Sequence, residues 1–178
     1  MAIPRIYNPQ TLDEGTIAEL GADYRVYLRD VLRLREGDEL ILFDGVGHEY
    51  RAVIRGFEHS AVRLEVAAKK DMILPVTGIT LAQSLPKGGK MEFIIQKATE
   101  LGVSRIIPFI SSRSIPRLTG DRAAGKAARW RKIAVEASRQ CGRVDVPEVS
   151  GIVSFDEMLR SGDGSALRII LWEGENQH

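Results

Sequence analysis

The feature that most constrains the fold of this chain is a change in its hydrophobic pattern near residues 69–75. Before this point, apolar and polar residues alternate in short stretches separated by glycine-containing turns, and this period of two predicts β strands. After it, short apolar stretches alternate with segments whose apolar residues recur every three or four positions, which predicts helices. We therefore predict an all-β domain over residues 1–70 and an α/β domain over residues 71–178.

The all-β domain is predicted from three stretches that read as strands, at residues 39–43, 48–57 and 61–67. A short helix is expected before them, over residues 24–34, with Val26, Val31 and Leu34 as candidate core positions. Several short strands within about 70 residues favour a small barrel.

The α/β domain is predicted from alternating strands and helices. Strands are expected at residues 78–83, 105–110 and 167–172, and helices at residues 89–101 and 122–140. Ser154 and Glu157 form a capping box that predicts a further short helix. Pro108 suggests that its strand lies at an edge or ends early. The alternation predicts a parallel sheet with right-handed crossovers, and three strands make it incomplete, so we expect more chain or a partner.

The charge is unevenly distributed, although the net charge is only +1. Residues 83–143 hold thirteen Lys and Arg against four Asp and Glu, so this segment carries +9 and the remainder −8. Such a basic block is typical of a surface that binds a polyanion, because each contact with a phosphate releases counterions. The alternative, a solvated helix face without a ligand, stays open.

Composition excludes several classes of protein. A single cysteine, Cys141, excludes an internal disulfide framework and fits a reducing cytoplasm. No Cys/His cluster has metal-ligand spacing, and no apolar run is long enough for a membrane span. Cys141 is either a nucleophile or, as we favour, a buried structural thiol, because no histidine is near it in the sequence.

Other local motifs allow two interpretations each. Pro86-Lys-Gly-Gly-Lys90 is either a flexible turn or a loop whose lysines and backbone N–H groups meet phosphate at a helix N-terminus. Lys97 and Glu100 are spaced as an ion pair, with Gln96 and Lys97 as possible ligand contacts. Trp130 is either a core aromatic, which we favour, or a platform on which a base stacks.

Order and spacing of several strings resemble one family over nearly the whole chain. The most specific are Gln96-Lys-Ala-Thr-Glu-Leu-Gly-Val103, Arg129-Trp130 and Gln140-Cys-Gly-Arg143. Weaker strings are Val31-Leu-Arg33, Gly37-Asp38, Phe43-Asp-Gly45, Gln83-Ser-Leu-Pro-Lys87, Met91-Glu92, Arg113-Ser114, Ile133, Glu136-Ala137 and Pro147. The chain thus resembles the bacterial 16S ribosomal RNA methyltransferases that modify N3 of a uridine, within the knotted SPOUT superfamily.

The resemblance implies an N-terminal PUA-like β-barrel that binds RNA, followed by a parallel α/β SPOUT-type methyltransferase domain with a trefoil knot. It further implies S-adenosylmethionine as methyl donor, 16S ribosomal RNA or the small ribosomal subunit as partner, a homodimer and a cytoplasmic location. Tyr27 stands where the family usually has histidine. The family's Gly-Pro-Glu-Gly-Gly and Leu-Gly-x-Arg-x-Leu-Arg-x-Glu-Thr strings do not occur. We expect the cofactor-binding residues to follow Trp172, the domain to be incomplete at its C-terminus, and the chain as given to be inactive alone.

These inferences give one leading function and its rivals. The leading function is transfer of a methyl group from S-adenosylmethionine to a uridine nitrogen, with a catalytic base that the sequence does not identify. The first rival is a non-catalytic RNA-binding module, and the second is a nucleotide-dependent α/β enzyme, which the lack of phosphate-binding fingerprints disfavours. The candidate RNA contacts are all Lys or Arg: Arg33, Arg51, Lys87, Lys90, Arg113, Arg129, Arg139 and Arg143.

Overall fold

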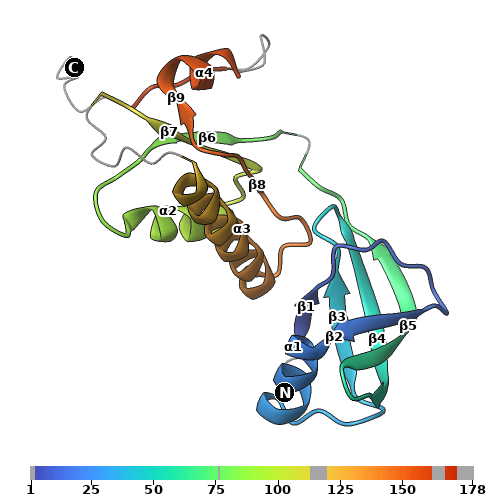
Figure 1. The fold of residues 1–178 in the computed structure, drawn as a ribbon. Coiled ribbons are helices and arrows are strands. Elements are labelled where there is room, and N and C mark those ends of the chain that lie inside the picture. Colours follow the sequence, from blue (N-terminus) through green and yellow to red (C-terminus); the bar gives the residue numbers. More distant parts are fainter. Residues whose placement is uncertain (1–2, 76, 113–119, 162–166, 172–178) are drawn as a thin grey trace.

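The structure is a computed structural model, and it describes residues 3–75, 77–112, 120–161 and 167–171. Two sheets form successively along the chain, each with its own hydrophobic core (Figure 1). The first sheet is built only from strands up to Asp71 and the second only from strands that begin at Thr80 or later. This order agrees with the predicted change from all-β to α/β structure, while the division into two independently folding domains stays a prediction.

The first sheet has five strands that curl around a common core, as predicted for a barrel-like unit. Their spatial order is β1-β3-β4-β5-β2, with β1 parallel to β3 and the other pairs antiparallel. The strands are β1 (Arg5–Tyr7), β2 (Ile17–Gly21), β3 (Glu39–Phe43), β4 (His48–Phe57) and β5 (Ala61–Asp71). β3 and β4 have the predicted bounds, β5 is four residues longer than predicted, and β1 and β2 were not predicted.

The helical segment of the first sheet differs from the prediction. It consists of α1 (Ala22–Val26) and a π-helical turn, η1 (Tyr27–Val31). Val26 and Val31 are exposed, whereas Leu28 is fully buried. The prediction that Val26 and Val31 belong to the core was therefore wrong. It assumed the spacing of an ordinary α-helix, whereas the wider π turn rotates the side chains to other directions. Leu34 does pack against the core, as predicted.

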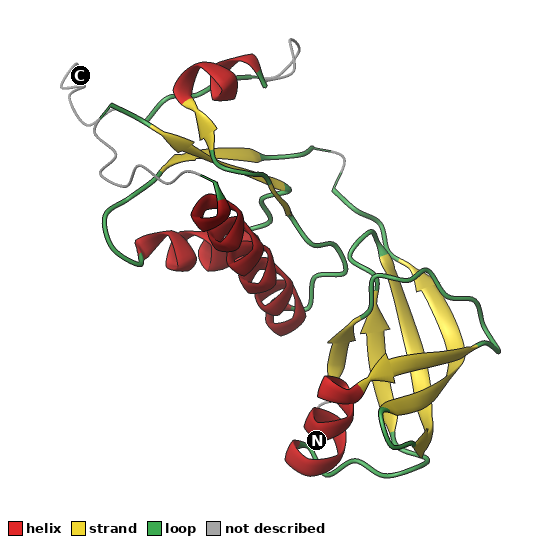
Figure 2. Cartoon of the chain, in the orientation of Figure 1, coloured by secondary structure: helices red, strands yellow, loops and turns green. Residues whose placement is uncertain are grey.

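The second sheet is parallel throughout its described ladders, as predicted. The central strand β7 lies between β6 on one side and two short strands, β8 and β9, on the other. The strands are β6 (Thr80–Ser84), β7 (Arg105–Ile110), β8 (Glu148–Val149) and β9 (Val153–Ser154). Helices α2 (Lys90–Glu100) and α3 (Asp121–Cys141) cover one face, and α4 (Phe155–Arg160) lies on the other (Figures 1 and 2).

Pro108 lies in the central strand, so its predicted edge position was wrong. Along a strand, the backbone N–H and C=O groups of successive residues point alternately to the two neighbouring strands. The Phe109 carbonyl points toward β6 and accepts a hydrogen bond from the Leu85 N–H, whereas the Ile106 carbonyl points the other way and accepts one from the Ser150 N–H. Pro108, two residues after Ile106, therefore faces the same side as Ser150. That side is unpaired between β8 and β9, so the missing N–H of proline breaks no ladder hydrogen bond.

The predicted strand at residues 167–172 does not form in its described part. Residues 167–171 have no secondary structure, and four of their side chains are largely exposed: Leu167, Ile169, Ile170 and Leu171. An apolar stretch becomes a strand only when a neighbouring strand supplies hydrogen bonds, and here β8 and β9 occupy the third position instead. Trp172 lies outside the described residues.

Candidate nucleic-acid interface

The hydrophobic core of the second sheet packs α2 and α3 against each other, and the polar faces of the two helices point outward. Trp130 is 4% exposed and packs with Ile95 and Ala134. This confirms the interpretation of Trp130 as a core aromatic, and it removes Trp130 as a platform for a base. Gly142 ends α3 in a left-handed conformation, as the sequence indicates.

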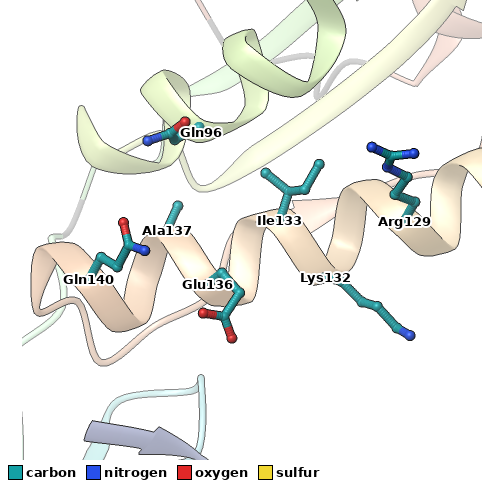
Figure 3. A pocket seen from close by; sticks show the side chains of 7 residues that line it. All are labelled: Gln96, Arg129, Lys132, Ile133, Glu136, Ala137 and Gln140. Atoms are coloured by element: carbon teal, nitrogen blue, oxygen red, sulfur yellow. The ribbon is translucent and has the colours of Figure 1, made fainter. Parts of the chain in front are cut away.

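A shallow hollow of about 270 Å³ lies along α3 where it faces α2. Figure 3 shows Ile133 and Ala137 pointing from α3 toward α2, while Lys132 and Glu136 point away from it. The hollow is lined by Gln96, Arg129, Lys132, Ile133, Glu136, Ala137 and Gln140. Its apolar floor and charged rim suit an elongated polar ligand that lies across the helix.

The loop before α2 brings two predicted lysines to the start of this helix. Gly88 has a φ of +73° and Gly89 precedes α2 without a side-chain cap. Lys87 and Lys90 are exposed and form no ion pair within the described residues. Free N–H groups at a helix start, together with two unpaired lysines, make this loop the most suitable position for a phosphate among the described residues.

Arg129 lies on the same side as this loop. Its Nη2 atom donates to Glu92 at 2.9 Å, and Glu92 belongs to the first turn of α2, which Lys90 begins. Arg129 keeps 68% of its side chain exposed. The ion pair thus holds Arg129 beside the first turn of α2, and Lys132, which sequence reasoning did not single out, adds a cation on α3 with no ion pair among the described residues.

Arg139 lies ten residues after Arg129 on α3, about 15 Å along the axis at the usual helical rise. It donates to Glu136 at 2.7 Å and to the Tyr27 hydroxyl at 3.2 Å. Burial opposes the charge of Arg139, but these hydrogen bonds outweigh burial and raise its pKa. Arg139 therefore stays charged where the helix meets the first sheet.

Arg143 is engaged inside the protein. Its guanidinium donates to the carbonyls of Thr99 and Val103 at 2.6 and 2.9 Å, and to Asp145 at 2.5 and 3.1 Å. Only 14% of its side chain is exposed. Its phosphate contact remains a prediction, but the described contacts give it a structural role that the sequence did not indicate.

The remaining candidate contacts lie apart from the α2–α3 surface or outside the described residues. Arg33 is exposed just after η1, with a φ of +58°, and Arg51 on β4 lies 3.9 Å from Glu39. Both belong to the first sheet. Arg113 is outside the described residues.

The Lys97–Glu100 motif and Cys141 make contacts within their own helices. Lys97 forms the expected ion pair with Glu100 at 2.7 Å, and Gln96 donates to the same carboxylate.

Cys141 is exposed, so the expectation of a buried thiol was wrong. The cysteine lies at the end of α3, three positions after the buried Ser138, where the helix leaves the core. Among the described residues, no cluster of His, Cys, Asp or Glu could hold a metal ion, and no helix is apolar enough to cross a membrane.

An all-β sheet followed by a parallel α/β sheet with a basic helical face defines a two-part architecture suited to nucleic acid. Comparison with known families agrees with this class. Residues 73–178 match the RNA methyltransferase domain, and residues 27–66 match the RNA methyltransferase PUA domain. Because the first match covers more than half of the chain, this chain belongs to the RNA methyltransferase family.

Individual relatives are consistent with this assignment. The chain is 34% identical over 153 residues to ribosomal RNA small subunit methyltransferase E of Bacillus subtilis, covering 85% of the chain and 59% of the relative. It is 32% identical over 166 residues to the protein of the same name from Synechocystis, covering 92% of the chain and 52% of the relative. The chain thus spans between half and three-fifths of the length of these two relatives.

A solved structure shares the fold over most of the chain. It is the Neisseria gonorrhoeae ribosomal RNA small subunit methyltransferase E bound to S-adenosylmethionine, with a TM-score of 0.82 and 37% identity. The similarity covers 92% of this chain and 67% of the other. The expected PUA-like and methyltransferase-type fold is thereby confirmed, while the trefoil knot stays a prediction.

Proposed function

We propose that this chain is part of an enzyme that transfers a methyl group from S-adenosylmethionine to N3 of a uridine in 16S ribosomal RNA. The main support is the match of residues 73–178 to the RNA methyltransferase domain, combined with the basic α2–α3 surface. The relatives bear the name of a small-subunit ribosomal RNA methyltransferase, and one was solved with the methyl donor. We also propose a homodimer that acts on the small ribosomal subunit in the cytoplasm.

Neither of the two hollows at α3 fits the methyl donor. The hollow on α3 and a second one beside it measure about 270 and 280 Å³, below the range of about 300–1,000 Å³ usual for sites of this kind of ligand. Arg129 and Lys132 at the first hollow would also repel the positive sulfonium group. Cofactor-binding residues beyond Trp172 remain a prediction that lies outside the described residues.

What the described residues supply is binding and orientation of the RNA. The reaction requires loss of the uridine N3 proton, and holding both reactants in place accounts for much of such a rate enhancement. The proposed RNA contacts are Lys87, Lys90 and Arg129 around the start of α2, with Arg33, Arg51, Arg113, Arg139 and Arg143 as further members.

Methyl transfer itself is tested with labelled S-adenosylmethionine and small ribosomal subunits that lack the modification. Label recovered as N3-methyluridine in the 16S RNA would support the proposal. If an intact enzyme that contains this chain binds the RNA but transfers no label and fails to bind S-adenosylmethionine in calorimetry, a non-catalytic RNA-binding module would be favoured.

The RNA surface is tested by the salt dependence of affinity. Replacing Lys90 and Arg129 by alanine should reduce the slope of log affinity against log salt by about one unit per lost phosphate contact. Arg160→Ala is the matched control, because Arg160 is also exposed but lies on α4, on the opposite face of the second sheet from α2 and α3 (Figure 1). An equal slope in the double variant and the control would exclude the α2–α3 surface as the phosphate contact.

A further inference from the structure

A second hollow, of about 280 Å³, lies between α3 and the first sheet. It is lined by Ile6, Tyr7, Asp23, Tyr24, Tyr27, Glu136 and Arg139. Three of the four tyrosines of the chain meet here; the fourth, Tyr50, is fully buried in the first core. We call this hollow the tyrosine crevice. Its volume suits a single planar ring system better than a ligand of drug-like size.

The walls of the crevice are held in place by side-chain contacts. The Tyr24 hydroxyl donates to the Tyr7 carbonyl at 3.1 Å. The guanidinium carbon of Arg139 lies 5.8 Å from the centre of the Tyr27 ring, and this guanidinium also donates to the Tyr27 hydroxyl. Tyrosine rings and arginine planes are the groups on which proteins stack unpaired bases of RNA.

The charges of the crevice select a base and not a phosphate. Asp23 and Glu136 bring two carboxylates to its rim. Glu136 is neutralised by Arg139, whereas Asp23 accepts no side-chain hydrogen bond within the described part of the chain and is exposed. A free carboxylate repels phosphate and accepts hydrogen bonds. Guanine, with adjacent N1–H and N2–H donors on one edge, matches its two oxygens, whereas uracil offers a single N–H donor.

We propose that the tyrosine crevice binds one unpaired guanine of the RNA substrate, with the ring against Tyr27 and Arg139 and its donor edge toward Asp23. This inference rests on the proposed RNA-binding function and adds a specificity site to it. The crevice shares helix α3 with the basic surface, and Arg129 and Arg139 are about 15 Å apart along that helix. A single strand of a few nucleotides can therefore contact Arg129 through phosphate and reach the crevice with one base.

The test uses the whole chain labelled with 3-fluorotyrosine, whose four fluorine resonances are assigned by Tyr→Phe variants. The labelled protein is titrated with the hexaribonucleotide UUGUUU and, separately, with hexauridine. We expect UUGUUU to shift the Tyr24 and Tyr27 resonances and to leave Tyr50 unchanged. We also expect it to bind at least fivefold more tightly than hexauridine. Asp23→Asn should abolish that fivefold difference, and Arg129→Ala should weaken both oligonucleotides by the same factor.

The possible failures are distinguishable. Binding of both oligonucleotides without shifts of Tyr24 and Tyr27 would overturn the crevice while leaving the basic surface as the RNA site. Equal shifts and equal affinities for the two would overturn the preference for guanine. A shift of Tyr50 equal to the others would indicate a global change and also contradict the proposal. Absence of any RNA binding would overturn the proposed function together with this inference.

Discussion

Two arginines of the basic segment show how one residue type takes different roles. Arg129 is mostly exposed and has one ion pair, whereas Arg143 donates to two carbonyls and a carboxylate from a nearly buried position. We predict that Arg143→Ala lowers the free energy of unfolding by about 2–4 kcal/mol, because it leaves these acceptors unpaired. Arg129→Ala should change it by less than about 1 kcal/mol. Chemical denaturation measures both; equal losses would contradict this assignment.

Asp44 is a buried carboxylate that joins several turn residues of the first sheet. Its side chain is fully buried and accepts from the backbone N–H groups of Val46 and His48, the His48 ring and the Tyr50 hydroxyl. Asp44→Asn should lower stability by about 2–4 kcal/mol, because an amide nitrogen would face donors. Asp71→Asn is the control, since Asp71 is 78% exposed and 3.6 Å from the same histidine. A loss in the control as large as in Asp44→Asn would contradict the prediction.

The same carboxylate gives a dependence on pH. Burial acts to raise the pKa of Asp44, but the hydrogen bonds from Val46, His48 and Tyr50 outweigh it, so its pKa is lowered from the usual 3.8. A carboxyl with a depressed pKa stabilises the folded state above the unfolded pKa, and this contribution is lost as the pH falls through the folded pKa. The difference in melting temperature between the wild type and Asp44→Asn should therefore be constant above about pH 5 and shrink below pH 3.8. A difference that grows on acidification would have the wrong sign.

At the level of elements, one turn of the first sheet makes a close contact with the segment that follows α3. Gly45, between β3 and β4, accepts a hydrogen bond from the Val146 N–H and pairs with Asp145. Its φ is +83°, and a Cβ atom there would lie 2.9 Å from the Tyr7 ring and 3.2 Å from the Val146 side chain. The β3–β4 turn can therefore approach the segment after α3 only because it carries glycine.

This turn has a matched control elsewhere in the first sheet. Gly15 has a φ of +78° but no atom within 4 Å of an added Cβ. Gly15→Ala should cost about 1 kcal/mol for backbone strain alone, whereas Gly45→Ala should cost that amount and at least about 1 kcal/mol more for the clash. Thermal unfolding compares the two variants, and indistinguishable melting temperatures would mean that the contact adapts freely.

At the scale of the whole molecule, exposed apolar residues bear on the proposed homodimer. Ile170 is 86% exposed in the stretch 167–171 beside the second sheet, and Ile73 is 99% exposed between the two sheets. If the α/β part holds the dimer interface, Ile170→Ser should raise the dimer dissociation constant at least about tenfold, because burying an isoleucine contributes about 1.5–3 kcal/mol. Ile73→Ser should leave it unchanged.

Light scattering over a dilution series measures this association. The intact enzyme should give twice its monomer mass at high concentration. A monomer at all concentrations would overturn the proposed dimer, and equal effects of the two serine variants would move its interface away from residues 167–171.

The amino-acid pattern alone predicts the elements whose signals are local. A short apolar stretch predicts β3 and a period of two predicts β4, both with the observed bounds. The helical spacing with Gly142 predicts α3 and its end. The basic segment and the family strings pointed to RNA before any contact was known. In each case the information lies within one segment, where propensity, periodicity and capping act over a few residues.

Properties that depend on pairing between distant segments follow from the folded chain and not from any local pattern. β1, β8 and β9 are two or three residues long and exist because a longer strand beside them supplies hydrogen bonds. Pro108 fits a central strand because its neighbour is interrupted there. The roles of Arg129 and Arg143 were separated by burial, and the tyrosine crevice joins Tyr27 to Arg139, 112 positions apart. Such contacts carry no local signal, because the free energy of each comes from groups that only the folded chain brings together.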